Sequence, residues 1–115
     1  MNISVELQTL DELHVKGSIG GEIDAFTAPI LREKLMEISL QENMHVELNL
    51  MDVSYMDSTG LGVFVGFYKS INAAGGHMEL TGLSSRLKRL FDITGLVEIM
   101  DIQAIDKEVK IDETV

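Results

Sequence analysis

Apolar residues alternate with polar ones near the start of the chain and again in its middle. The stretches 3–7, 13–19 and 46–50 all follow this pattern. A period of two residues places the apolar side chains on one face of a β-strand, so the sequence predicts a strand over each stretch. The polar segment 9–12 predicts a hairpin turn between the first two strands. Three glycines are expected to mark the end of the second strand: Gly17, Gly20 and Gly21.

Helical periodicity appears between and after these strands. The predicted helices run from Thr27 to Ile38, from Asp57 or Ser58 to the glycine pair 75–76, and from Ser84 or Ser85 to Gly95. A proline in the first turn, small polar residues at helix starts and glycines just beyond helix ends are typical boundaries. Short strands are predicted at 78–80 and 97–102, although the last segment is also compatible with a helix.

The order of elements predicts an α/β fold with a mixed, mostly parallel sheet that follows an N-terminal hairpin. In such sheets the loops that leave the carboxyl ends of the strands meet at one edge. The loop 22–27 and the loop 57–60 are therefore expected to face the same way. The length of 115 residues predicts a single domain, 1–115, with a core over about 3–102 and a charged C-terminal tail.

Composition removes several classes of protein. The chain has no cysteine, which excludes disulfides and thiolate metal sites. Its N-terminus lacks the basic and apolar regions of a signal peptide, and no apolar run reaches the ~18 residues of a membrane span. We therefore expect a cytoplasmic protein that does not enter a membrane.

The net charge of −10 argues against binding to nucleic acid, because neutralising phosphates requires clustered Lys and Arg. Two interpretations of the charge remain open. It keeps the protein soluble, or it steers association with a protein partner that has a basic docking surface.

The sequence YMDSTGLGV, residues 55–63, joins a predicted strand to a predicted helix. The free N–H groups and partial positive charge of a helix N-terminus favour anions. The glycines Gly60, Gly62 and Gly66 have a simpler interpretation, in which they allow the helix to lie close to the sheet. The motif therefore indicates either close packing or a place where phosphate is held or added.

Four kinds of chemistry fit this motif poorly. A nucleotide-binding P-loop has a lysine after its second glycine, and a serine nucleophile usually lies in G-x-S-x-G. The three histidines fall in separate predicted strands. Asp52 and Asp57 lack a third metal ligand at a recognisable spacing, so we assign no metal. The acidic cluster and late lysine of a phospho-aspartate receiver are also missing.

Ser58 remains as a phosphate acceptor. A phosphoserine carries roughly −1.5 to −2 charges at neutral pH, which the N-terminus of its own helix tolerates. A partner docked against the loop would experience added bulk and repulsion, strengthened by Asp24 and Asp57. Phosphorylation would then switch binding without disturbing the fold.

Three segments resemble bacterial anti-sigma factor antagonists of the STAS domain superfamily, most closely the general-stress, sigma-B type. They are GEIDAFTAPILREKL at 21–35, DVSYMDSTGLGVFVG at 52–66 and LSSRLKRLFDITGL at 83–96. The resemblance implies a STAS-type fold, in which helices and sheet wind as a β-α superhelix. It offers nothing for the C-terminal tail.

The resemblance also implies a regulator in a partner-switching circuit, which is not an enzyme and carries no cofactor. The unphosphorylated protein would bind a serine-kinase anti-sigma factor and so release the sigma factor. The kinase would phosphorylate Ser58, with Thr59 as a minor acceptor, and a PP2C-type serine phosphatase would restore the protein. ATP and magnesium would belong to the kinase.

Residues expected to contact the kinase come from three places: Glu22, Asp24 and Thr27; Asp57, Ser58, Thr59, Gly60 and Leu61; and Ser84, Ser85 and Arg86. For the acids and serines, capping or solubility is the alternative role, and Leu61 is expected to be shared with the core. Two other functions are also considered for the chain. One is a STAS scaffold or sensory module that binds other STAS domains, and the other is a small hydrolase that uses Ser58.

Overall fold

The computed structural model describes residues 2–95 and 101–104. Its elements are β1 (Ile3–Asp11), β2 (His14–Ile23), α1 (Ala28–Met36), β3 (His45–Met56), α2 (Ser58–Ala73), β4 (His77–Leu83), α3 (Ser85–Thr94) and β5 (Asp101–Ala104). The described strands form one sheet in the order β1-β2-β3-β4-β5. The pair β1–β2 is antiparallel and the other pairs are parallel. The predicted α/β class and mostly parallel sheet are confirmed.

The N-terminal hairpin is longer and tighter than predicted. β1 continues to Asp11, which pairs with His14, so only residues 12–13 form the turn. The three glycines do not end β2, which continues to Ile23. A Cβ atom at Gly17 would lie 2.8 Å from Leu48 Cδ2, and one at Gly21, where φ is +95°, would collide with the Asn2 carbonyl. These glycines permit close contacts within the sheet instead of breaking it.

The helix boundaries follow the predicted signals closely. Asp57 caps α2, Ser84 caps α3, and Gly95 ends α3 in the left-handed conformation at φ +77°. α1 ends at Met36, two residues before the predicted end at Ile38. The last predicted strand falls partly on residues 96–100, outside the described part of the chain, and β5 is found at 101–104.

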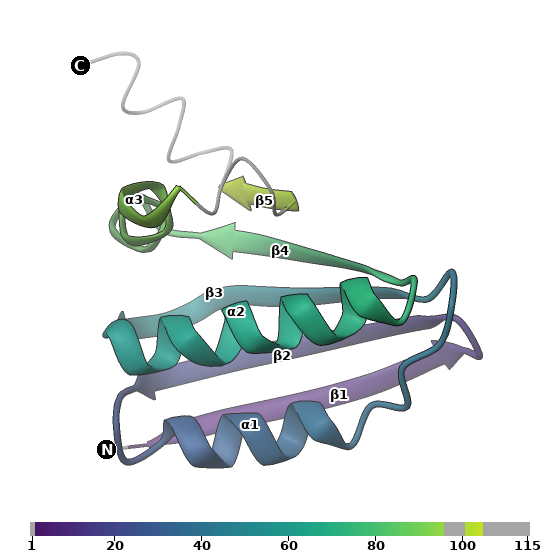
Figure 1. Cartoon of the computed structure of the whole chain (residues 1–115). Helices are drawn as coiled ribbons and strands as arrows, with labels where there is room; N and C mark the ends of the chain where they lie inside the picture. The colour runs from purple at the N-terminus through teal and green to yellow at the C-terminus, as the bar shows by residue number, and fades with distance from the viewer. Residues whose placement is uncertain (1, 96–100, 105–115) are drawn as a thin grey trace.

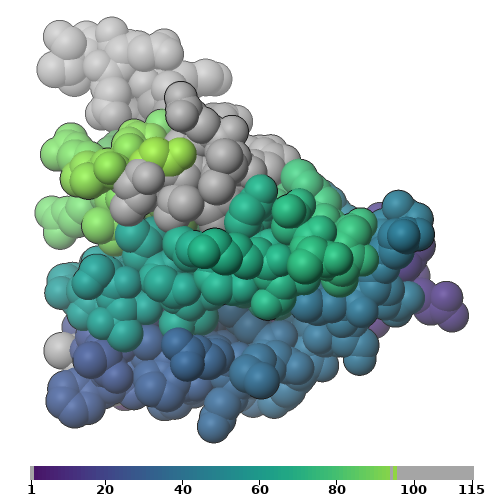
Figure 2. All heavy atoms as spheres, viewed as in Figure 1, coloured from purple at the N-terminus to yellow at the C-terminus, as the bar shows by residue number. Residues whose placement is uncertain are grey.

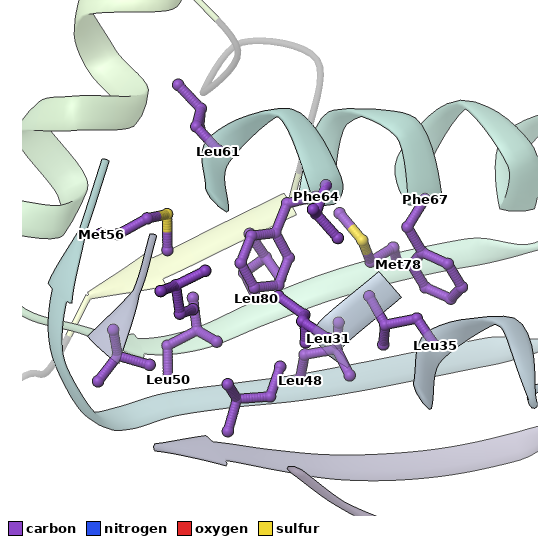
Figure 3. Packing of buried hydrophobic residues seen from close by; sticks show 14 of the residues in the cluster. Leu31, Leu35, Leu48, Leu50, Met56, Leu61, Phe64, Phe67, Met78 and Leu80 are labelled. Atoms are coloured by element: carbon purple, nitrogen blue, oxygen red, sulfur yellow. The ribbon is translucent and has the colours of Figure 1, made fainter. Parts of the chain in front are cut away.

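The helices α1 and α2 lie side by side over one face of the sheet (Figures 1 and 2). α1 contacts β1, whereas α2 contacts β3 and β4. Leu31, Leu48, Phe64 and Leu80 are fully buried between these layers, and Figure 3 shows them interleaved. The strand residues that alternate with the core ones are directed to the opposite face. This packing fixes where the N-terminus of α2 lies.

Candidate phosphorylation and docking site

The carboxyl ends of β2 and β3 bring two loops together. Ile23 pairs with Met56 in the last register position of these parallel strands. The N–H of Asp57 donates a hydrogen bond to the carbonyl of Ile23 at 3.1 Å. Both α1 and α2 begin at this end of the sheet (Figure 1). The predicted convergence of the loops 22–27 and 57–60 is confirmed.

Asp57 builds the N-terminus of α2. Its Oδ1 atom accepts hydrogen bonds from the N–H groups of Thr59 at 2.9 Å and Gly60 at 3.2 Å. Ser58 is the first residue of the helix, and both Ser58 and Thr59 are exposed. The motif therefore presents two hydroxyls on the first turn of a helix whose dipole favours an added negative charge.

Gly60 and Leu61 anchor this turn in the core. A Cβ atom at Gly60 would lie 2.5 Å from Ile23 Cγ2 and 2.9 Å from Met56 Cγ, so the close-packing interpretation holds at this position. Leu61 is only 7% exposed. Both residues were expected to contact a partner. Their burial means that they hold Ser58 in place and present little surface of their own.

The loop between β2 and α1 has its own hydrogen-bond network. Asp24 Oδ1 accepts hydrogen bonds from the N–H groups of Phe26 at 2.9 Å and Thr27 at 3.0 Å. The Thr27 hydroxyl donates to the carbonyl of Glu22 at 2.7 Å and accepts from the N–H of Asp24 at 2.9 Å. Asp24 and Thr27, both expected at the docking surface, are buried. Their polar atoms are hydrogen-bonded within the loop, so they can act on a partner through the shape of the loop and through the negative charge of Asp24.

The network also determines the charge of Asp24. The N–H donated by Thr27 is the main cause that lowers the pKa of Asp24, and the N–H of Phe26 and the Thr27 hydroxyl add to it. Loss of solvation on burial raises the pKa, but these hydrogen bonds outweigh it. The carboxylate therefore stays ionised at neutral pH, a fixed negative charge near the first turn of α2.

The third group of predicted residues flanks the same edge. Ser84 uses its hydroxyl as the cap of α3, accepting from the N–H of Leu87 at 3.2 Å. Arg86 is exposed and lines a groove of about 240 Å³ together with Tyr55 and Ile93. This groove runs between α3 and the end of β3, and its lining includes Met56, two residues before Ser58.

Sequence reasoning missed three exposed apolar side chains at this end of the molecule. Phe26 is 82% exposed, Ile93 is 78% exposed and Tyr55 is 46% exposed. Large apolar side chains that remain in water near a polar site often mark a protein interface. For two of them the available signal was position in the sequence: Phe26 lies in a predicted loop, and Tyr55 is the first residue of the motif at 55–63.

Gly62 and Gly66 do not pack against the sheet, and the close-packing interpretation is wrong for them. A Cβ atom at either position would have no neighbour within 4 Å. Both glycines instead line a groove of about 410 Å³ between α1 and α2, together with Arg32 and Ser70. Gly62, Gly66 and Ser70 therefore face the groove beside α1 and not the core.

The three histidines lie far from Ser58. His14, His45 and His77 each begin a strand, whereas Ser58 follows the far end of β3. A strand of this length spans roughly 35–40 Å, so a serine–histidine nucleophile cannot form.

Among residues 2–95 and 101–104, no helix has both the length and the apolar character needed to cross a membrane.

Comparison with known proteins agrees with this architecture. Residues 5–115 match the STAS domain family. The chain belongs to this family. The match includes the charged C-terminal segment, for which the sequence resemblance offered nothing.

Curated relatives extend over most of this STAS domain chain. It is 51% identical over 104 residues to the anti-sigma-B factor antagonist of Bacillus subtilis, covering 90% of this chain and 94% of that protein. The anti-sigma-B factor antagonist of Listeria monocytogenes is 47% identical over 108 residues, covering 94% and 95%. The resemblance to antagonists of the sigma-B type is confirmed.

The solved structure of the Bacillus cell fate determinant SpoIIAA in its phosphorylated form shares the fold. It aligns with a TM-score of 0.68 at 21% identity, covering 97% of this chain and all of the other. The likeness confirms the STAS-type arrangement of sheet and helices.

Proposed function

We propose that this protein is an anti-sigma factor antagonist of the sigma-B type, controlled by phosphorylation of Ser58. Its unphosphorylated form binds a serine-kinase anti-sigma factor in the cytoplasm and thereby releases the sigma factor. The observation that carries the proposal is the exposed Ser58 hydroxyl, placed at the sheet edge where the predicted docking residues converge. The names of relatives at 41–51% identity support it.

The kinase that binds the protein also phosphorylates it, using its own ATP and magnesium. Ser58 is the principal acceptor, and Thr59, which is also exposed, is a minor one. A PP2C-type serine phosphatase removes the phosphate. These partners act on side chains of the first helical turn, which Asp57 holds in a defined conformation through its hydrogen bonds.

The added phosphate acts on the complex and not on the fold. It brings roughly −1.5 to −2 charges to a surface that already carries Asp57 and the ionised Asp24. The N-terminus of α2 accommodates this charge, because free N–H groups and the helix dipole favour an anion there. A partner packed against Phe26 and Tyr55 must instead accommodate the bulk and repulsion of the phosphate in a desolvated interface.

The test compares the affinity of variants for the purified kinase anti-sigma factor. Ser58→Asp should weaken binding at least tenfold, because it places a charge in the interface. Ser58→Ala should bind like the wild type and resist release by ATP. Ser39→Asp adds the same charge at an exposed site beyond the far end of α1 and should leave affinity unchanged.

Thermal melting of the same variants separates the interface from the fold. All variants should have melting temperatures close to that of the wild type, since Ser58 and Ser39 are both exposed. Equal affinities for Ser58→Asp and Ser39→Asp would contradict the proposal. A STAS scaffold role, the alternative function, would then be tested by binding to other STAS domains.

A further inference from the structure

Three neighbouring strands each begin with a histidine. His14 pairs with His45 in the register of β2 and β3, and His45 pairs with His77 in the register of β3 and β4. The residue that follows each histidine is buried in the core. Because side chains alternate across a strand, all three imidazoles lie on the sheet face opposite α1 and α2.

The three rings form one row. The ring centroids of His14 and His45 are 6.3 Å apart, and those of His45 and His77 are 5.2 Å apart and nearly parallel, at 26°. His45 stands in the middle, because its strand lies between those of His14 and His77, and adjacent strands are about 5 Å apart. A row of three imidazoles at one register position concentrates nitrogen donors on a small exposed area.

Carboxylates accompany two of the rings. Nδ1 of His14 lies 2.8 Å from Asp11 Oδ1, and Nε2 of His45 lies 3.1 Å from Glu79 Oε1. A carboxylate on one ring nitrogen fixes the tautomer and orientation of the ring and makes its other nitrogen a better ligand. Glu47 pairs with Glu79 in the register of β3 and β4 and adds a further oxygen donor.

We propose that this row binds one divalent transition-metal ion of the zinc and nickel class, with the imidazoles of His14, His45 and His77 as ligands. The ion would lie over β3, and the flanking rings would lean inward toward it. In the described residues no three donor groups yet surround one point, so the rings must turn about their side-chain torsions on binding. Imidazole suits these metals, and neighbouring carboxylates offset the positive charge.

This site is independent of the switch. It lies at the amino ends of β2, β3 and β4, whereas Ser58 follows the carboxyl end of β3. Failure of the phosphorylation proposal would therefore not affect the metal site, and failure of the metal site would not affect the phosphorylation proposal.

Isothermal titration calorimetry with zinc chloride and with nickel chloride tests the proposal on the full chain at pH 7.5. The wild type should bind one ion per chain. His45→Asn and His77→Asn should each weaken binding at least about tenfold, since even the outer-shell partners of metal ligands contribute that much. Lys16→Gln, on the same face but not a ligand, should bind like the wild type.

Histidine ring signals in NMR spectra of the wild type provide a second readout, independent of whether a variant folds. Addition of zinc should shift the signals of all three imidazoles with a one-to-one end point. Absence of binding by the wild type, unshifted ring signals, or equal affinity in the wild type and His45→Asn would overturn the proposal.

Discussion

The hydroxyl of Thr27 has two short hydrogen bonds in the loop between β2 and α1, to the carbonyl of Glu22 and from the N–H of Asp24. Thr27→Val keeps the shape but leaves these buried groups without a partner. We expect the free energy of unfolding to fall by about 1–3 kcal/mol, measured by urea denaturation. Thr59→Val makes the same change at an exposed position and should stay within about 0.5 kcal/mol of the wild type. Equal losses in the two variants would contradict this role.

The carboxylate of Asp24 predicts a dependence of stability on pH. Its pKa is lower in the folded protein than its ordinary value, chiefly because Thr27 donates an N–H to it. As pH falls, the unfolded chain therefore takes up the proton first, and unfolding becomes easier. The stabilisation from Asp24 is complete above the ordinary aspartate pKa of about 3.9. It is lost as pH falls through the lower pKa that Asp24 has in the folded protein.

Asp24→Asn retains an oxygen that can accept the same hydrogen bonds but does not titrate there. From about pH 6 to about pH 3 its stability should fall less steeply than that of the wild type. Urea denaturation over this range measures the difference. If the free energy of unfolding changed with pH in the same way for the wild type and Asp24→Asn, the loop would not be holding Asp24 ionised.

Within helix α2, two glycines have opposite surroundings. Gly60 faces Ile23 and Met56 so closely that a methyl group would overlap them, whereas Gly66 faces an open groove. Gly60→Ala should lower the free energy of unfolding by about 1–3 kcal/mol through overpacking. Gly66→Ala should raise it by about 0.5–1 kcal/mol, because alanine favours the helix. Thermal melting of both variants tests these two predictions. A change in stability of the same sign in both variants would be inconsistent with this packing.

Element types and helix ends could be predicted because their causes are local. The cap of α2 at Asp57 and the end of α3 at Gly95 depend on residues within one turn. The extent of β2 could not be predicted, because its glycines are accommodated by residues of β1 and β3 that are distant in sequence. The outward direction of Gly62 and Gly66 likewise depends on how α2 lies against α1.

In the whole molecule, the candidate site is only partly visible in the sequence. The alternation of strands and helices was enough to predict that the loops at 22–27 and 57–60 meet. Burial of Asp24 and exposure of Phe26 could not be read from composition, because both residues sit in the same short loop without periodicity. The hydrogen bonds of the loop decide which of its side chains are buried and which are exposed.

The molecule has two chemically different ends. One gathers Ser58, the loop of Phe26 and the start of α3 at the carboxyl ends of the strands, and the other gathers three histidines at their amino ends. The first end has exposed hydroxyls and exposed apolar side chains. The sheet between them is packed against a continuous buried core, and a phosphate at the first end is expected to act locally.

The most direct test of the central claim is the intact mass of the protein after incubation with the proposed kinase anti-sigma factor and magnesium ATP, followed by fragmentation to locate the modification. We predict one phosphate, on Ser58, together with dissociation of the complex. Ser58→Ala should remain in the complex with little or no phosphate. A complex that persists with Ser58 fully phosphorylated, or a principal phosphate elsewhere in the chain, would contradict the proposed switch.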